Sequence, residues 1–156
     1  MKQALNDLLL RLENTVNGEP WFGRSALSLL KEVNPEGVFM KTGNGGHSIA
    51  DLLWHMITWA QFTLDRLEKK QEKDMAAFES LDWRTIDPAI HSWKNGIKEF
   101  TLIYGKISDL LKKKNDAFLE EKVDYRDYNV QFLLNGLIEH TIYHLGQIAY
   151  AQKQLN

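Results

Sequence analysis

Apolar residues recur along most of the chain with the spacing of amphipathic helices. In the first stretch they follow an i, i+3, i+4, i+7, i+11 pattern: Leu5, Leu8, Leu9, Leu12 and Val16. This spacing puts apolar side chains on one face of a helix. The segment 18–20 interrupts the pattern, and a second apolar stretch ends before Pro35. The pattern therefore predicts one broken helical element over residues 2–33.

A second helix is predicted to follow a glycine-containing loop at residues 34–47. Ser48 is a favourable N-cap, and Asp51 three residues later completes a variant of the capping box. A broad apolar face then extends to Leu67 and ends in the charged stretch 68–74. We expect residues 71–86 to form a long connection.

Two further helices are predicted in the second half of the chain. Asp87 as N-cap and Pro88 at the first helical position mark the start of one, whose apolar residues alternate in steps of three and four to Leu111. The other is expected from about Asn129 to Lys153. No segment has a clear strand pattern, and the nearest candidate, 122–128, is short and charged.

These elements predict an all-α protein whose four long helices form a four-helix bundle. The length of 156 residues fits a single domain over residues 1–156. The two longest connections precede the second and third helices. Connections of that length permit a crossover, so the topology need not be a simple up-down-up-down one.

Composition narrows the classes of function. A net charge of −2 gives no basic field to hold nucleic acid or an anionic membrane. No apolar run approaches the roughly 18 residues of a membrane span, and the N-terminus lacks the apolar core of a signal peptide. The absence of cysteine excludes disulfides, thiolate metal sites and a cysteine nucleophile. We therefore expect a cytoplasmic protein that binds neither nucleic acid nor membranes.

Histidines on apolar helix faces are the candidate chemistry of the chain. His140 and His144 are four residues apart, so a helix places both imidazoles on one face. Each buried ring needs a partner, which a metal ion or separate hydrogen bonds would supply. The spacing alone leaves both interpretations open. His55, near the edge of the second helix's apolar face, is either a third ligand or a half-exposed groove residue.

Other polar residues near these histidines have more than one possible role. Asp51 lies one turn before His55 and is a candidate acceptor for its ring, although helix capping is the favoured role. His47 and His91 are expected to face solvent. Tyr143 and Gln147 are candidates for the mouth of a pocket.

Several known motifs are absent. Thr141 stands where the zincin motif needs a glutamate after His140, and no Glu-x-x-His pair supports a di-iron site. Glu139 points about 100° away from His140, so no general base can be assigned. The glycines at 43, 45 and 46 lack the lysine and spacing of a phosphate-binding loop.

Four segments together resemble the DinB-like, or YfiT-like, family of metalloenzymes. The segment 20–25 (PWFGRS) is similar to the family's first-helix signature, and 47–55 (HSIADLLWH) to its second-helix motif. Trp83 corresponds to a tryptophan between helices two and three. The segment 140–148 (HTIYHLGQI) resembles the fourth-helix motif. Each motif is short, but their order and spacing are specific, and they extend over nearly the whole chain.

The resemblance implies a four-helix bundle with up-down-down-up topology. It also implies a divalent metal ion, most often zinc or nickel, bound by His55, His140 and His144. Members of this family are commonly homodimers. They include thiol-dependent transferases that use bacillithiol or mycothiol, and maleylpyruvate isomerases, while many have no established activity.

Three histidine ligands leave open coordination positions, which is typical of a catalytic site. Such a site suits hydrolysis by an activated water or transfer of a low-molecular-weight thiol to a small-molecule substrate. The lack of an assignable base favours thiol transfer. The alternative is a non-catalytic, dimeric bundle that binds a metal or a small ligand. The substrate and the catalytic residues are not assigned by the sequence.

Overall fold

The computed structural model describes residues 3–43, 45–70 and 74–155, and in these ranges the chain is all-α. Seven helices and no strand occur there: α1 Gln3–Asn17, α2 Ala26–Glu32, α3 Ile49–Leu67, α4 Met75–Asp82, α5 Trp93–Lys112, α6 Ala117–Glu120 and α7 Val130–Leu155. Residue 2 of the expected first helix, 44 of the expected loop and 71–73 of the expected connection lie outside the described residues. The predicted fold class is confirmed.

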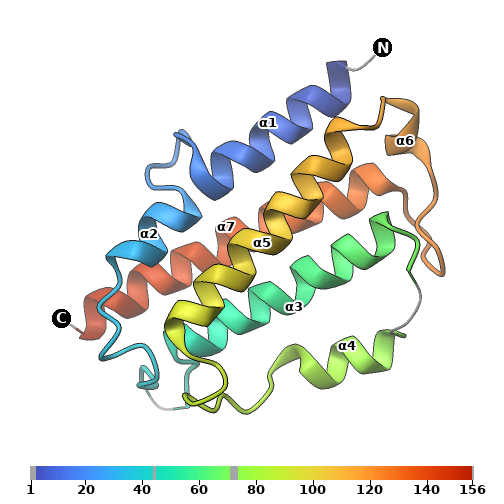
Figure 1. Cartoon of the computed structure of the whole chain (residues 1–156). Coiled ribbons are helices and arrows are strands. Elements are labelled where there is room, and N and C mark those ends of the chain that lie inside the picture. The colour runs from blue at the N-terminus through green and yellow to red at the C-terminus, as the bar shows by residue number, and fades with distance from the viewer. Residues whose placement is uncertain (1–2, 44, 71–73, 156) are drawn as a thin grey trace.

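The bundle is made by the α1–α2 element and helices α3, α5 and α7, which lie side by side (Figure 1). The α1–α2 element and α7 run in one direction, while α3 and α5 run together in the opposite one. Helix α3 packs against both α5 and α7. This is the up-down-down-up order that the family resemblance implied. Because α3 and α5 are parallel, the chain between them must return along the bundle, and α4 lies on that return path.

The predicted start of the second helix is confirmed atom by atom. Ser48 Oγ accepts a hydrogen bond from the backbone N–H of Asp51 at 3.0 Å, and Asp51 Oδ2 accepts one from the N–H of Ser48 at 2.8 Å. These bonds satisfy two backbone donors that a helix otherwise leaves free. Asp51 is therefore a capping residue that fixes the beginning of α3, one turn before His55.

Two boundaries in the crossover differ from the prediction. The expected connection contains a helix, α4, which is capped by Asp74 and anchored by buried Phe78. The third long helix begins at Trp93 with Ser92 as N-cap, not at Asp87 and Pro88. Asp87 instead closes a separate turn, in which its Oδ1 accepts from the N–H of Ala89 at 2.9 Å.

The prediction that α5 begins at Asp87 was wrong because the first apolar residue of that stretch is not buried. Ile90 is 65% exposed, so no core contact draws this turn into α5. The strand candidate at 122–128 forms no strand, and only an isolated bridge joins Lys122 to Asn129. The first helical element is broken as predicted, into α1 and α2.

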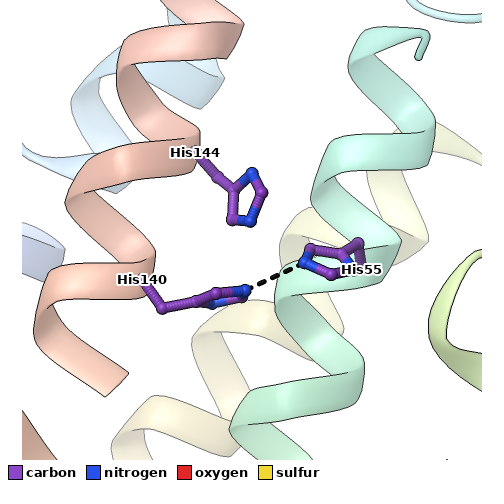
Figure 2. A group of neighbouring side chains, drawn as sticks. All are labelled: His55, His140 and His144. Carbon is purple, nitrogen blue, oxygen red and sulfur yellow. Dashed lines mark hydrogen bonds between the residues drawn. The ribbon is translucent and has the colours of Figure 1, made fainter. Parts of the chain in front are cut away.

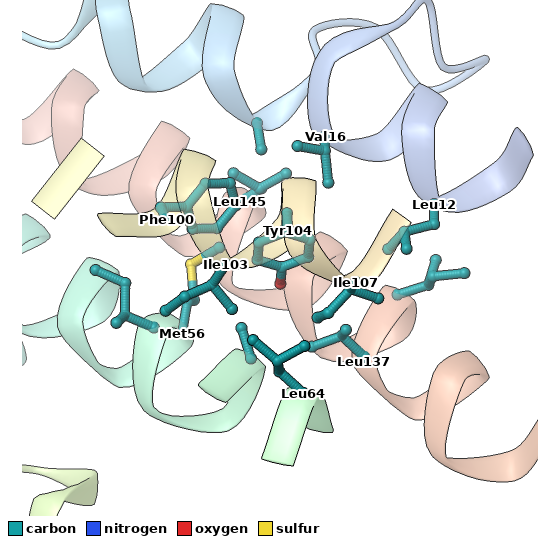
Figure 3. Close-up of a cluster of buried hydrophobic side chains, with 14 of the residues drawn as sticks. Leu12, Val16, Met56, Leu64, Phe100, Ile103, Tyr104, Ile107, Leu137 and Leu145 are labelled. Carbon is teal, nitrogen blue, oxygen red and sulfur yellow. The ribbon is translucent and has the colours of Figure 1, made fainter. Parts of the chain in front are cut away.

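The core lies between α5 and the other three long elements (Figure 3). Tyr104 of α5 is fully surrounded, and its hydroxyl lies 2.6 Å from Thr141 Oγ1 of α7. Thr141 in turn donates to the carbonyl of Leu137 at 2.7 Å. This buried pair fixes the rotation of α7 at the residue that directly follows His140. Among the described residues, no helix combines the length and apolarity needed to cross a bilayer.

A matched pair of glycines on α5 tests how closely α3 and α5 approach. A Cβ atom at Gly96 would lie 2.7 Å from Leu53 Cδ2, whereas one at Gly105 would meet no atom within 4 Å. We expect Gly105→Ala to stabilise the protein by up to about 1 kcal/mol through helix propensity. Gly96→Ala should instead destabilise it by about 1–3 kcal/mol, because buried Leu53 has little room to move. Urea denaturation measures both, and an equal gain for both variants would contradict the close approach.

Candidate metal centre

The three histidines singled out in the sequence converge between α3 and α7. His55 extends from α3, while His140 and His144 extend from successive turns of α7 (Figure 2). The Nε2 atoms of His55 and His140 are 2.9 Å apart, and one ligand nitrogen from each ring lies within 4.8 Å of the others. His55 and His144 are 6% and 5% exposed, and His140 is half-buried. The chain thus brings together residues separated by 85 positions.

This geometry fits a shared metal ion. Histidine nitrogens bind zinc at about 2.0–2.1 Å, so two of them on one tetrahedral ion are separated by about 3.3 Å. The Nε2 atoms of His55 and His140 are 2.9 Å apart, which is a hydrogen-bond distance, so a small outward movement of either ring would give the separation that a shared ion needs. The buried Nδ1 of His140 has no hydrogen-bond partner, so this ring is not held by protein hydrogen bonds at both nitrogens. The cluster could therefore hold a metal ion.

Partners at the outer ring nitrogens turn two of the imidazoles toward the shared centre. His144 Nδ1 lies 2.5 Å from Gln147 Oε1, and His55 Nδ1 lies 2.5 Å from Asp82 Oδ1. The Asp82 contact lacks the alignment of a regular hydrogen bond, and its carboxylate attracts the N–H group of the neutral ring as a nearby negative charge. Both oxygen atoms favour a proton on Nδ1, which leaves the Nε2 lone pair available to an ion.

Asp82, the last residue of α4, is a site residue that the sequence reasoning missed. Its Oδ1 also accepts a hydrogen bond of 2.7 Å from Trp59 Nε1 on α3. The role that we considered for Asp51 belongs to Asp82, because Asp51 is engaged in its capping box. The available signal was the position of Asp82 next to Trp83, which the family resemblance had already marked.

Trp83 covers the outer face of His55. The rings of Trp83 and His55 are stacked with centroids 3.9 Å apart, and those of Trp83 and His47 are stacked at 3.7 Å. The imidazole planes of His47 and His55 are both nearly parallel to the indole plane at these short distances. The two imidazoles therefore lie on opposite faces of Trp83. His47 was expected to face solvent. It is exposed, and through its contact with Trp83 it also belongs to the outer layer of the site.

The remaining candidates lie farther out. His91 is half-buried, and its Nδ1 accepts from the backbone N–H of Asp87, so it is not part of the cluster. Tyr143 is 65% exposed and meets the His144 ring edge to face at 5.0 Å. Glu139 is exposed, in agreement with its predicted direction. Gln147, considered for a pocket mouth, is the partner of His144 described above.

Burial keeps the three imidazoles in the neutral form that binds metal. Desolvation lowers the pKa of His140 to about 3, with further lowering by the neighbouring rings of His144 and His55. Desolvation also lowers the pKa values of His55 and His144, against the opposing effect of Asp82 on both. In the described part of the chain, the cluster contains three such ligands and no fourth histidine, aspartate or glutamate.

Comparison with known proteins gives one family. The model of the DinB superfamily matches residues 22–148, a range that includes all three histidines, Asp82 and Trp83. No curated protein and no solved structure matches the chain.

The low pKa of His140 predicts an acid-sensitive fold in metal-free protein. The unfolded chain takes up a proton at this residue near pH 6.5, but the folded protein does so only near pH 3. Stability is therefore complete above about pH 6.5 and falls toward pH 3, by up to about 1.4 kcal/mol per pH unit for this one group. Urea denaturation at several pH values, with a chelator present, should show a shallower pH dependence for His140→Gln than for the natural chain. Equal slopes would rule out this contribution.

Proposed function

The chain belongs to the DinB superfamily, and on this premise we propose that it is a metal-dependent enzyme whose ion is held by His55, His140 and His144. The observation that carries the proposal is a set of three buried imidazoles with no fourth histidine, aspartate or glutamate ligand in the described chain. Zinc and nickel suit imidazole ligands best among the common candidates. A divalent ion at this site supplies Lewis acidity and open coordination positions for a small molecule.

The surrounding residues act as positioning residues in this proposal. Asp82 fixes the tautomer and direction of His55, and Gln147 does the same for His144. Trp83 covers one face of His55 and keeps water from that side of the ring. Thr141, held by Tyr104, keeps His140 and His144 on the face of α7 that meets α3.

We further propose transfer of a low-molecular-weight thiol to an electrophilic small molecule, in preference to hydrolysis. Hydrolysis calls for a base next to the reacting water. The carboxylate nearest the cluster, Asp82, is already engaged by Trp59 and His55, and Glu139 points to solvent. In thiol transfer the sulfur forms a bond to the acceptor carbon, the leaving group departs with its electron pair, and the thiol proton passes to solvent.

The alternative of a non-catalytic metal-binding bundle is less well supported. A structural metal site closes its coordination shell with four protein ligands. Within the described residues the cluster offers three, so an exchangeable position remains for a substrate or a thiol.

The ligand assignment predicts a graded loss of metal binding. The purified protein should bind one divalent ion per chain, and His144→Ala should lose most of that binding. Asp82→Asn should lower zinc affinity by about 10–100-fold, because the partner that orients His55 loses its charge. Asp51→Asn is the matched control, a carboxylate on the helix of His55 that contacts the backbone of Ser48 instead. Competition titration with a chromophoric chelator measures these affinities, and stoichiometric binding retained by His144→Ala would contradict the site.

The reaction class is tested with zinc- or nickel-loaded protein, bacillithiol and 1-chloro-2,4-dinitrobenzene. We expect thioether formation and chloride release faster than the uncatalysed reaction, with a loss of about 100-fold or more in His144→Ala. Asp51→Asn should retain the rate. If metal-loaded protein accelerates no thiol transfer from bacillithiol, mycothiol or glutathione to a panel of electrophiles, thiol transfer is the wrong class.

A further inference from the structure

We propose that an apolar pocket beside His140 binds an uncharged aromatic or short alkyl group of the substrate. The pocket has a volume of about 230 Å³ and lies between α3, α7 and the beginning of α4. Its role in substrate selection rests on the proposed function, whereas its capacity to bind an apolar group can be measured separately.

The wall of the pocket is apolar and uncharged. Its main contributors are Trp59 and Phe62 of α3, Met75 of α4, and Phe132 and Leu137 of α7. None of the residues that line it is aspartate, glutamate, lysine or arginine. A charged group would lose its hydration here without gaining a partner of opposite charge among the lining residues, so the pocket selects against charged ligands.

Two polar groups in this wall are already satisfied within the protein. The Thr63 hydroxyl donates to the carbonyl of Trp59 at 2.9 Å, and Trp59 Nε1 donates to Asp82 at 2.7 Å. An apolar ligand therefore leaves both of these hydrogen bonds in place. Binding removes apolar surface of both the ligand and the pocket from water, which is favourable. It breaks neither of these two hydrogen bonds, so no cost of an unpaired polar group opposes binding at Thr63 or Trp59.

The volume indicates the size of the group. A cavity of about 150 Å³ lined by aliphatic and aromatic side chains is enough to bind benzene. The pocket of about 230 Å³ therefore accommodates a substituted phenyl ring or a short branched alkyl chain.

The pocket adjoins the histidine cluster at His140. His140 contributes both to the pocket wall and to the set of three ligands. Trp59 connects the same wall through Asp82 to His55. A group seated in the pocket consequently holds the atoms attached to it next to the cluster, which is the position of the acceptor carbon in thiol transfer.

A small molecule fits this pocket better than a protein segment does. Phe62 and Leu137 are each only 3% exposed, so the deep wall is recessed below the surface, and Phe132 marks the exposed rim. A second copy of the chain could contact that rim. Oligomeric state is therefore measured in the same experiment.

Gly136 allows the pocket to be filled without disturbing the helix. It lines the pocket, and a Cβ atom added there would meet nothing within 4 Å. Replacement of a helical glycine by leucine also favours the helix. Gly136→Leu should therefore occupy the pocket and keep the fold. Gly105→Leu is the matched control, since Gly105 is an equally open helical glycine on α5 that does not line this pocket.

In the experiment, toluene is titrated into the full chain, and benzoate serves as the charged comparison. Each titration is done on the protein as purified and on protein treated with a chelator, and amide NMR signals report binding. Toluene should shift amide signals in 132–140 of the natural protein and bind at least tenfold more tightly than benzoate. Gly136→Leu should weaken toluene binding tenfold or more, with unchanged metal content, while Gly105→Leu should match the natural protein.

Other outcomes would overturn the proposal. It fails if toluene does not bind the natural protein or binds Gly136→Leu equally well. It also fails if Gly136→Leu changes only the oligomeric mass in light scattering, because the pocket is then covered by a second copy. If the natural, metal-loaded protein binds toluene but catalyses no thiol transfer, only the proposed function is contradicted. If it catalyses thiol transfer but does not bind toluene, only the proposal for this pocket is contradicted.

Discussion

The constraint on which the site depends is the burial of three imidazoles, His55 and His144 almost fully and His140 by about half, between two packed helices. Each ring must find a partner for its polar nitrogens away from water. Asp82 and Gln147 serve the outer nitrogens of His55 and His144, and the inner nitrogens converge between α3 and α7. Desolvation then keeps the rings uncharged. The same burial that costs stability in the absence of an ion thus prepares the ligands for one.

The parallel arrangement of α3 and α5 explains how the outer layer of the site is built. Parallel neighbours require a return segment along the bundle, and this segment contains α4. Its end delivers Asp82 and Trp83 to the exposed side of His55. A simple up-and-down bundle would join these helices by a short turn and would have no such segment. Topology, and not only the choice of ligands, therefore determines what surrounds the cluster.

Sequence periodicity was sufficient for the long helices and for the pair His140 and His144, because both follow from the repeat of one helix. The contribution of His55 depends on how two distant helices pack, so only the family resemblance predicted it. Helix α4 was missed because eight residues show too little periodicity, and Asp82 was missed with it. The apolar pocket was equally inaccessible, since its wall combines residues from three separate helices.

The separation of 85 residues between His55 and His140 has a thermodynamic consequence. An ion held by both would join the middle of the chain to its last helix, and the unfolded chain offers no comparable site. Its binding free energy would then add directly to the free energy of unfolding, and rise with the concentration of free ion. Supply of metal in the surroundings would set how much of this protein remains folded under thermal or chemical stress, before any substrate is present.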